Sequence, residues 1–232
     1  LSAQVHTDYV CQPCIQLRSC MERLKTVLLL AICMLCYACS DDNDGNGYPS
    51  VITSLLDVQT DADKNVASIT SDDEQTFYLP NQTLSTNYAD TVVRCLGVYE
   101  ADTISHEAKV YSLQNVISYT PRIYEDPNGL PHEAVRIISS WRTDRYFNML
   151  IAFLTTGNGS HAFGFSEDSI TVTQEGANTA FISLLHKRPE NDALSYSQKV
   201  FVSLPTHLYA GKADSIVFSV NTYDGPRVFG IK

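Results

Sequence analysis

Glu125-Asp126-Pro127-Asn128-Gly129-Leu130-Pro131 divides the chain into two series of short β-like runs. Proline cannot donate to a sheet ladder and glycine tolerates turn conformations, so this composition favours an irregular connection. We therefore predict a linker at residues 119–132. On both sides of it the sequence alternates between apolar runs and turn residues, and no stretch keeps helical periodicity for three turns.

The part before the linker, residues 50–118, is predicted to form one small domain. Polar turns separate its apolar runs, as Ser71-Asp72-Asp73-Glu74 does at the tip of a hairpin. The strand candidates are residues 51–58, 66–70, 76–79, 91–100 and 108–116. Five short strands over about 70 residues suit a small barrel. We therefore expect an N-terminal OB-like β-barrel.

The part after the linker, residues 133–232, is predicted to form a second all-β domain. Its clearest turn is Thr156-Gly157-Asn158-Gly159-Ser160. The strand candidates are residues 134–141, 146–155, 161–165, 169–173, 179–187, 196–204, 215–222 and 227–231. This spacing predicts an antiparallel, Ig-like β-sandwich. Val200, Val202 and Leu204 are expected to share one face of their strand, because side chains alternate along it.

Residues 1–38 contain a secretory signal. Met21-Glu22-Arg23-Leu24-Lys25 supplies a basic start, and the apolar run that follows is shorter than the roughly 20 residues of a membrane-spanning helix. It ends Leu35-Cys36-Tyr37-Ala38-Cys39, which resembles the lipobox of bacterial lipoproteins. We expect translation from Met21, cleavage before Cys39, and attachment of lipid (including palmitate) to Cys39. Several acyl chains on one residue would anchor the protein stably in the membrane. An ordinary signal peptide with incidental cysteines is the alternative.

Residues 39–49 are predicted to be an acidic tether. Ser40-Asp41-Asp42-Asn43-Asp44 follows the lipidated cysteine directly. Acidic residues at this place resemble the signal that sends lipoproteins of Bacteroidetes-type bacteria to the outer face of the outer membrane. A flexible solvated spacer is the alternative. A calcium loop would need Glu at its twelfth position, where Thr53 stands. We expect a lipid-anchored protein of the outer membrane, exposed at the cell surface.

Composition limits which partners the chain can bind and which roles its cysteines can have. The chain has a net charge of -10, and residues 39–120 contain only three cations, Lys64, Arg94 and Lys109. A single-stranded nucleic acid groove needs cations along its length, so no nucleic acid partner is expected. Six of the seven cysteines precede residue 40. The seventh, Cys95, lies in an apolar run and is predicted to be a small buried hydrophobic residue.

The sequence contains no catalytic or metal-binding motif that we recognise. None of the six histidines has zinc-ligand spacing. Gly164-Phe165-Ser166-Glu167-Asp168 begins like a nucleophile elbow, but Asp168 replaces its second glycine. We therefore expect no enzyme activity, no metal and no cofactor. An envelope enzyme such as a glycan hydrolase is the alternative, and it would require two carboxylates facing each other across a cleft.

One aromatic group is a candidate for ligand binding. Trp141 is the only tryptophan, and Arg142 and Tyr146 lie close to it in the sequence. A tryptophan beside an arginine can form a stacking platform for a ligand. The alternative is a tryptophan in the core of the sandwich, which is common in this fold class.

Four short motifs each contain Asp, a hydroxyl residue and an aliphatic residue. They resemble the O-glycosylation site of Bacteroidetes-type secreted proteins, and the candidate hydroxyls are Thr91, Thr103, Ser169 and Ser215. The structural alternative is that the aspartate ends a turn while the next two residues begin a strand.

Taken as a set, several motifs make the chain resemble the NigD-like lipoproteins of the cell envelope. The motifs are 51–58, Asp72-Asp73, 111–113, 141–148, 186–192, 202–205 and 221–225. The resemblance implies an OB-like barrel followed by a β-sandwich, and it supplies no catalytic residues. It also implies a link to bacteriocins, through immunity or export. Together with the anchor, it leads us to expect a non-enzymatic surface lipoprotein that binds an unidentified protein or glycan.

Overall fold

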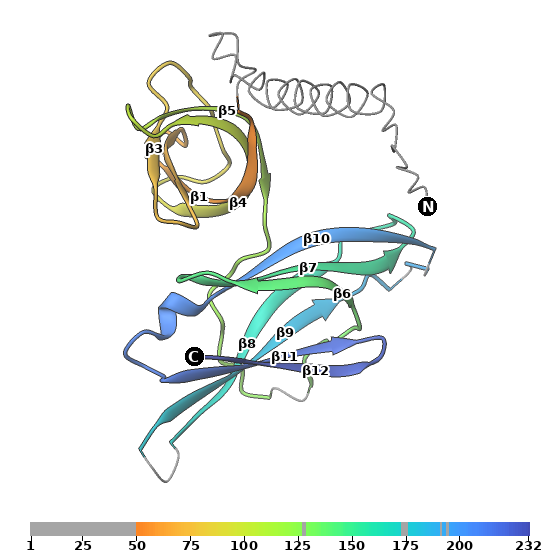
Figure 1. The fold of residues 1–232 in the computed structure, drawn as a ribbon. Coiled ribbons are helices and arrows are strands. Elements are labelled where there is room, and N and C mark those ends of the chain that lie inside the picture. Colours follow the sequence, from red (N-terminus) through yellow and green to blue (C-terminus); the bar gives the residue numbers. More distant parts are fainter. Residues whose placement is uncertain (1–49, 127–128, 173–175, 191, 194) are drawn as a thin grey trace, which may run out of the picture. The chain divides into compact units, whose positions relative to one another are not determined.

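The computed structural model describes residues 50–126, 129–172, 176–190, 192–193 and 195–232. The expected signal peptide, the lipidation site at Cys39 and the acidic tether lie outside these residues. The described chain consists mainly of strands and turns and includes a short 3-10 helix, η2 (Thr206–Tyr209) (Figure 1). None of the described helical segments has the length and apolar character of a membrane span.

The first five strands close into a barrel. They are β1 (Ile52–Thr60), β2 (Val66–Ser71), β3 (Thr76–Tyr78), β4 (Val92–Asp102) and β5 (Glu107–Asn115). Their order is β1-β2-β3-β5-β4, and β4 pairs back onto β1 to complete the circle. All neighbours are antiparallel except β3 and β5, which are parallel. This closed five-stranded arrangement confirms the predicted OB-like barrel (Figure 1).

Alternation along the strands forms the barrel core. Leu56 and Val58 on β1 and Ile69 on β2 are fully buried in one cluster with residues of the other strands. Gly97 on β4 is part of this packing, because a side chain there would collide with the Leu56 side chain. The barrel wall therefore needs a residue without a side chain at this point of β4.

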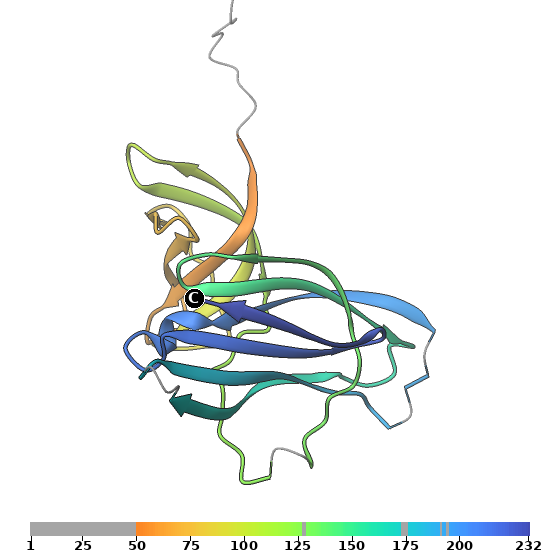
Figure 2. The same ribbon diagram turned by 60° about the horizontal axis from the view of Figure 1, so that its bottom comes forward.

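Seven further strands form two sheets. They are β6 (Arg136–Arg142), β7 (Tyr146–Thr155), β8 (Ala162–Val172), β9 (Asn178–Lys187), β10 (Tyr196–Pro205), β11 (Ser215–Thr222) and β12 (Gly225–Ile231). One sheet has the order β10-β7-β6 and the other β12-β11-β9-β8 (Figures 1 and 2). Apolar residues of both sheets join in one core, where Phe147 of β7 meets Phe218 of β11 edge to face at 5.9 Å. The predicted all-β sandwich is confirmed.

Two details of the predicted sandwich are wrong. Strand β11 runs parallel to β9, although an antiparallel sandwich was expected. The intervening strand, β10, belongs to the other sheet, so the chain returns to the first sheet in its original direction. In addition, the separate strands expected at 161–165 and 169–173 are one strand, β8. Its register shifts between Glu167 and Ser169, so a bulge bends the strand without ending it.

The segment expected to be a linker makes backbone hydrogen bonds to the sandwich. The Arg122 N–H donates to the Phe165 carbonyl (3.0 Å), and the His186 N–H donates to the Pro131 carbonyl (3.0 Å). The described part of residues 119–132 therefore lies against β8 and β9. Its backbone groups are satisfied by strands that come later in the sequence, which local turn signals do not indicate.

Cys95 gives a first testable prediction. Its side chain is buried in the barrel core, as the sequence predicts, and burial raises the pKa of its thiol to about 11. Because the thiolate is the reactive form, iodoacetamide at pH 8 should leave Cys95 unmodified in the native chain and alkylate it after denaturation. Peptide mass spectrometry after timed labelling measures this at Cys95 alone. Equal labelling rates in the two states would contradict the buried placement.

Candidate functional site

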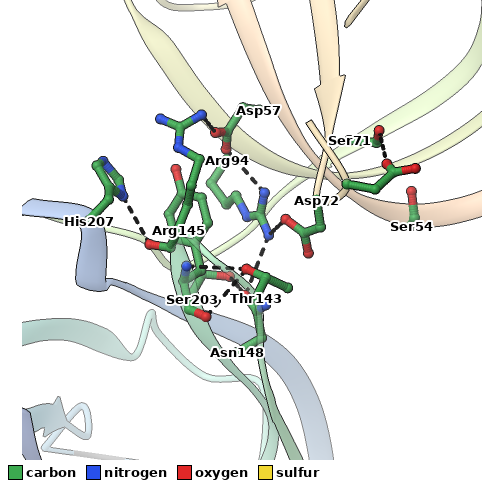
Figure 3. A network of polar contacts seen from close by, with 12 residues as sticks. Ser54, Asp57, Ser71, Asp72, Arg94, Thr143, Arg145, Asn148, Ser203 and His207 are labelled. Carbon is green, nitrogen blue, oxygen red and sulfur yellow. Dashed lines mark hydrogen bonds and ion pairs between the residues drawn. The ribbon is translucent and has the colours of Figure 1, made fainter. Parts of the chain in front are cut away.

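A buried network of charges joins the barrel to the sandwich (Figure 3). On the barrel side, Arg94 of β4 donates from Nη1 to Asp57 of β1 at 3.1 Å. It also donates from Nη2 to Asp72, after β2, at 2.5 Å. The guanidinium and Asp57 are almost fully buried. Burial raises the pKa of Asp72, and the charge of Arg94 opposes that shift. One arginine thus bridges two carboxylates, one on β1 and one in the turn after β2.

The sandwich side of the network comes from β7 and its preceding turn. The Tyr146 ring lies 4.0 Å beneath the Arg94 guanidinium, which is a cation–π contact. Arg145 forms an ion pair with the other oxygen of Asp57 at 2.8 Å. The Asn148 side-chain oxygen accepts from Ser203 Oγ at 2.6 Å and lies 3.5 Å from Arg94 Nη2. Figure 3 shows Arg145 beside Asp57, and Asn148 and Ser203 below Arg94.

Several of the motifs on which the resemblance to NigD-like lipoproteins rests meet in this network. The motifs at 51–58, 72–73, 141–148 and 202–205 each contribute at least one side chain to it. Their residues are far apart in the sequence and form one contact between barrel and sandwich. We call this contact the barrel–sandwich joint, made of Asp57, Asp72, Arg94, Arg145, Tyr146, Asn148 and Ser203. Through these buried ion pairs and hydrogen bonds, the motif residues hold the barrel and the sandwich together.

The structure separates the three residues expected to form a ligand platform. Tyr146 is buried in the joint, where burial and the neighbouring Asp57 raise the pKa of its hydroxyl. Trp141 pairs with Asn148 across β6 and β7, and Arg142 pairs with the core residue Phe147, so Trp141 and Arg142 point to opposite faces. Adjacent strand residues cannot act together on one face. Trp141 alone therefore stays available as a platform.

Trp141 does not belong to the sandwich core. Its side chain is 37% exposed and it lies outside both hydrophobic clusters. It packs edge to face against Phe201 of β10, with ring centroids 6.3 Å apart. The alternative of a core tryptophan is therefore wrong. The reason is that β6 is the outermost strand of its sheet, and Trp141 faces away from the facing sheet.

Trp141 is part of a larger surface on the three-stranded sheet. Side chains that alternate with the core residues of β6, β7 and β10 point away from the core. We call this surface the outer sheet face, and it consists of Arg136, Ser139, Trp141, Leu150, Lys199 and Phe201. Arg136 and Lys199 lie on either side of Ala152, are exposed, and make no ion pair within the described part of the chain. The face combines aromatic and aliphatic contact area with unpaired positive charge.

Sequence reasoning missed a second polar cluster, at the opposite end of β9 from the η2 helix. His186 donates from Nδ1 to the Glu133 carbonyl (3.1 Å), and its Nε2 lies 2.8 Å from His161 Nδ1. The other nitrogen of His161 lies 2.7 Å from Asp192 Oδ2. The Phe163 ring stacks on His186 at 4.4 Å. The histidines come from neighbouring strands at distant sequence positions, so no local spacing indicated the pair.

The hydrogen-bond partners indicate which ring nitrogens in this histidine cluster donate and which accept. Burial lowers the pKa of His186 to about 4, so its ring is neutral and its Nε2 accepts. His161 Nδ1 then donates to that nitrogen, and His161 Nε2 faces the Asp192 carboxylate. Hydrogen bonds from Thr156 hold the pKa of Asp192 below its usual range. Every ring nitrogen is occupied, so the cluster stabilises the fold and offers no free base.

The candidate O-glycosylation residues differ in accessibility. Thr91, Thr103 and Ser169 are exposed. Ser215 is half-buried, and its hydroxyl lies 2.9 Å from the Thr179 hydroxyl on the neighbouring strand. Three of the four hydroxyls can therefore be reached by a modifying enzyme in the folded chain, and modification at them stays a prediction.

The suspected nucleophile elbow does not have the geometry of one. Ser166 is fully buried in the middle of β8, with no strand-to-helix turn around it. Across the described residues there is also no group of three or more His, Cys, Asp or Glu side chains placed to hold a metal ion.

Comparison with known proteins gives matches among solved structures. No protein-family model and no curated sequence matches the chain. A NigD-like immunity protein from Bacteroides caccae is 26% identical, with a TM-score of 0.57, over 79% of this chain and 92% of its own. This similarity confirms the resemblance that the sequence motifs predict.

Two further solved structures share the fold. A protein from Parabacteroides distasonis described as a candidate toxin-related protein is 14% identical, with a TM-score of 0.60 over 78% of this chain and 92% of its own. A candidate lipoprotein from Bacteroides fragilis is 11% identical, with a TM-score of 0.55 over 79% of this chain and 98% of its own. At these identities the likeness concerns the fold alone.

Proposed function

We propose that the chain is a non-enzymatic lipoprotein, anchored through Cys39 in the outer membrane and exposed at the cell surface, that binds an acidic protein partner through the outer sheet face. The lipobox-like sequence and the acidic residues after it support the anchor. The similarity to a NigD-like protein and to a candidate lipoprotein agrees with a role in the envelope.

The observation that carries the proposal is the composition of the outer sheet face. Trp141 and Phe201 provide an aromatic pair at the surface, and tryptophan is enriched where protein interfaces concentrate their binding energy. Arg136 and Lys199 lie beside this pair, one on each side of Ala152, without carboxylate partners among the described residues, in a chain whose net charge is -10. Unpaired cations on an acidic protein attract an acidic partner and orient it during encounter.

Site-specific photo-crosslinking in the native host tests this proposal. A photoreactive residue replaces Ser139, which lies on the outer sheet face opposite Leu150. We expect a crosslinked acidic protein that disappears in Trp141→Ala and in the double variant Arg136→Glu/Lys199→Glu. The matched controls are Tyr78→Ala, an exposed aromatic on the barrel, and Arg227→Glu/Lys212→Glu, which makes the same charge change elsewhere. A crosslink that survives the face variants, or is lost equally in the controls, would contradict the proposal.

A second candidate function is immunity to a bacteriocin. The observation that favours it is the 26% identity to a protein described as an immunity protein. On this reading the acidic partner would be the toxin itself. Deleting the gene should make the host sensitive to a co-encoded toxin, and restoring the wild-type chain should reverse this. Unchanged sensitivity after deletion would rule the immunity role out.

A further inference from the structure

The barrel contains a cavity of about 560 Å³ whose lining has no charged side chain. It lies between the loop at residues 84–88, the first half of β4 and the second half of β5. Its volume falls within the range of roughly 300–1,000 Å³ that small-ligand sites occupy. In a chain with a net charge of -10, an uncharged concave surface of this size is a distinct chemical environment.

The floor of this cavity is apolar and rigid. Leu84, Val93 and Leu113 line it and pack against the hydrophobic core of the barrel, and Cys95 beside them is buried. These side chains are fixed by the closed wall of the barrel, which pairs Cys95 with Asn115 across β4 and β5. A ligand would therefore meet a preformed apolar surface at the bottom of the cavity.

The loop over the cavity is held in place by its own hydrogen bonds. Thr86 Oγ1 donates to the Tyr88 carbonyl at 2.9 Å, and Ser85 Oγ donates to the Asn65 side chain at 3.1 Å. The Thr86 N–H also donates to the Lys64 carbonyl at 2.8 Å. The loop is thus attached to the turn between β1 and β2, which reduces the ordering that a ligand would have to impose.

The rim of the cavity offers polar groups that have no partner within the described chain. The side chains of Asn87, Ser112 and Gln114 line the cavity and make no hydrogen bond to another described residue. Two of the three are carboxamides, which donate and accept at the same time. Tyr88 adds an aromatic ring that is 45% exposed. The rim therefore provides paired donors and acceptors next to a flat apolar ring.

These features fit one class of ligand. We propose that the cavity binds a neutral carbohydrate, with carboxamides bonding to neighbouring hydroxyls and the Tyr88 ring packing on the apolar face of a sugar ring. An anion or a cation would lose its hydration here without gaining a charged partner. The other large barrel cavity, about 670 Å³, differs because Glu100, Asp102, Glu107 and Lys109 line it. The proposal is independent of the outer sheet face, which belongs to the sandwich.

Saturation-transfer NMR on the detergent-purified full chain tests the carbohydrate site. The probes are neutral gluco- and manno-oligosaccharides of three to four units, with hexuronate oligosaccharides as charged counterparts. We expect transfer to at least one neutral probe and none to the charged ones. Binding should weaken at least tenfold in Asn87→Ala/Gln114→Ala and in Tyr88→Ala. Gln75→Ala, an exposed amide in the turn between β2 and β3, should bind as the wild type does.

Because these side chains are exposed, we expect the substitutions to leave the stability of the fold unchanged. A thermal melt of each variant checks this. Absence of transfer to every neutral probe would overturn the proposal. So would stronger transfer to the hexuronates, or equal loss of binding in Gln75→Ala. None of these outcomes bears on crosslinking at Ser139, so failure here and failure of the proposed partner binding can be told apart.

Discussion

Replacing Arg94 with methionine is expected to lower the free energy of unfolding by about 3 kcal/mol. The methionine side chain has a similar length but no charge, so Asp57 and Asp72 lose the guanidinium that both of them contact. Asp57 is buried and, among the described residues, keeps Arg145 and the Tyr146 hydroxyl as its side-chain partners. A buried carboxylate with too few partners is costly, because its lost hydration is no longer compensated.

Urea unfolding followed by circular dichroism measures this effect. Arg145→Met is the matched control, because Arg145 pairs with the same Asp57 but its side chain is 40% exposed. That variant should lose about 1 kcal/mol or less, as solvent-exposed ion pairs do. Arg94→Lys should be only a partial rescue, since a lysine cannot form the forked contact with two carboxylates. If Arg94→Met cost no more than Arg145→Met, the joint would not be the buried ion-pair network described above.

The second large effect is a loss of stability in mild acid. The pKa of His186 is about 4 in the folded chain, against a usual value of 6.5. Between these pH values the unfolded chain binds a proton that the folded chain does not, so stability falls as the pH decreases from 6.5 to 4. Allowing for partial screening by solvent, the loss from this group is about 2 kcal/mol.

Asp192 extends the acid effect to lower pH. The pKa of this carboxylate is held below its usual value by the Thr156 hydrogen bonds, so its contribution is present above about pH 4 and is lost as the pH falls further. Both groups therefore destabilise the chain in the same direction. The folded chain should tolerate neutral and mildly alkaline pH better than acid.

His186→Phe separates the histidine from other acid-sensitive groups. Phenylalanine can keep the stacking contact with Phe163 but cannot titrate. We expect this variant to be less stable at pH 7, because His161 and the Glu133 carbonyl lose a hydrogen-bond partner, yet to have a flatter dependence between pH 6.5 and 4. His106→Asn is the control, since His106 is exposed in a turn with φ 55° that asparagine tolerates. An unchanged slope in His186→Phe would exclude the histidine cluster as the cause.

The strands, and their division into two groups, could be predicted from the sequence because they depend on local patterns. The run at 146–155 and the run at 215–222 coincide with β7 and β11, since alternation and flanking turns define strand ends. The parallel pairing of β9 with β11 could not be predicted from the sequence, because it depends on which sheet the intervening β10 joins. That choice is made by packing across the core and leaves no signal within either strand.

The sites show the same division. The sequence by itself determined the all-β class, the two groups of strands, the buried Cys95 and Trp141 as a residue to examine, because each follows from composition or period-two alternation. Only the tertiary structure decided that Tyr146 lies under Arg94 and that His161 meets His186 and Asp192. These contacts join residues dozens of positions apart, and long-range pairing is fixed when strands close into a barrel or stack into a sandwich.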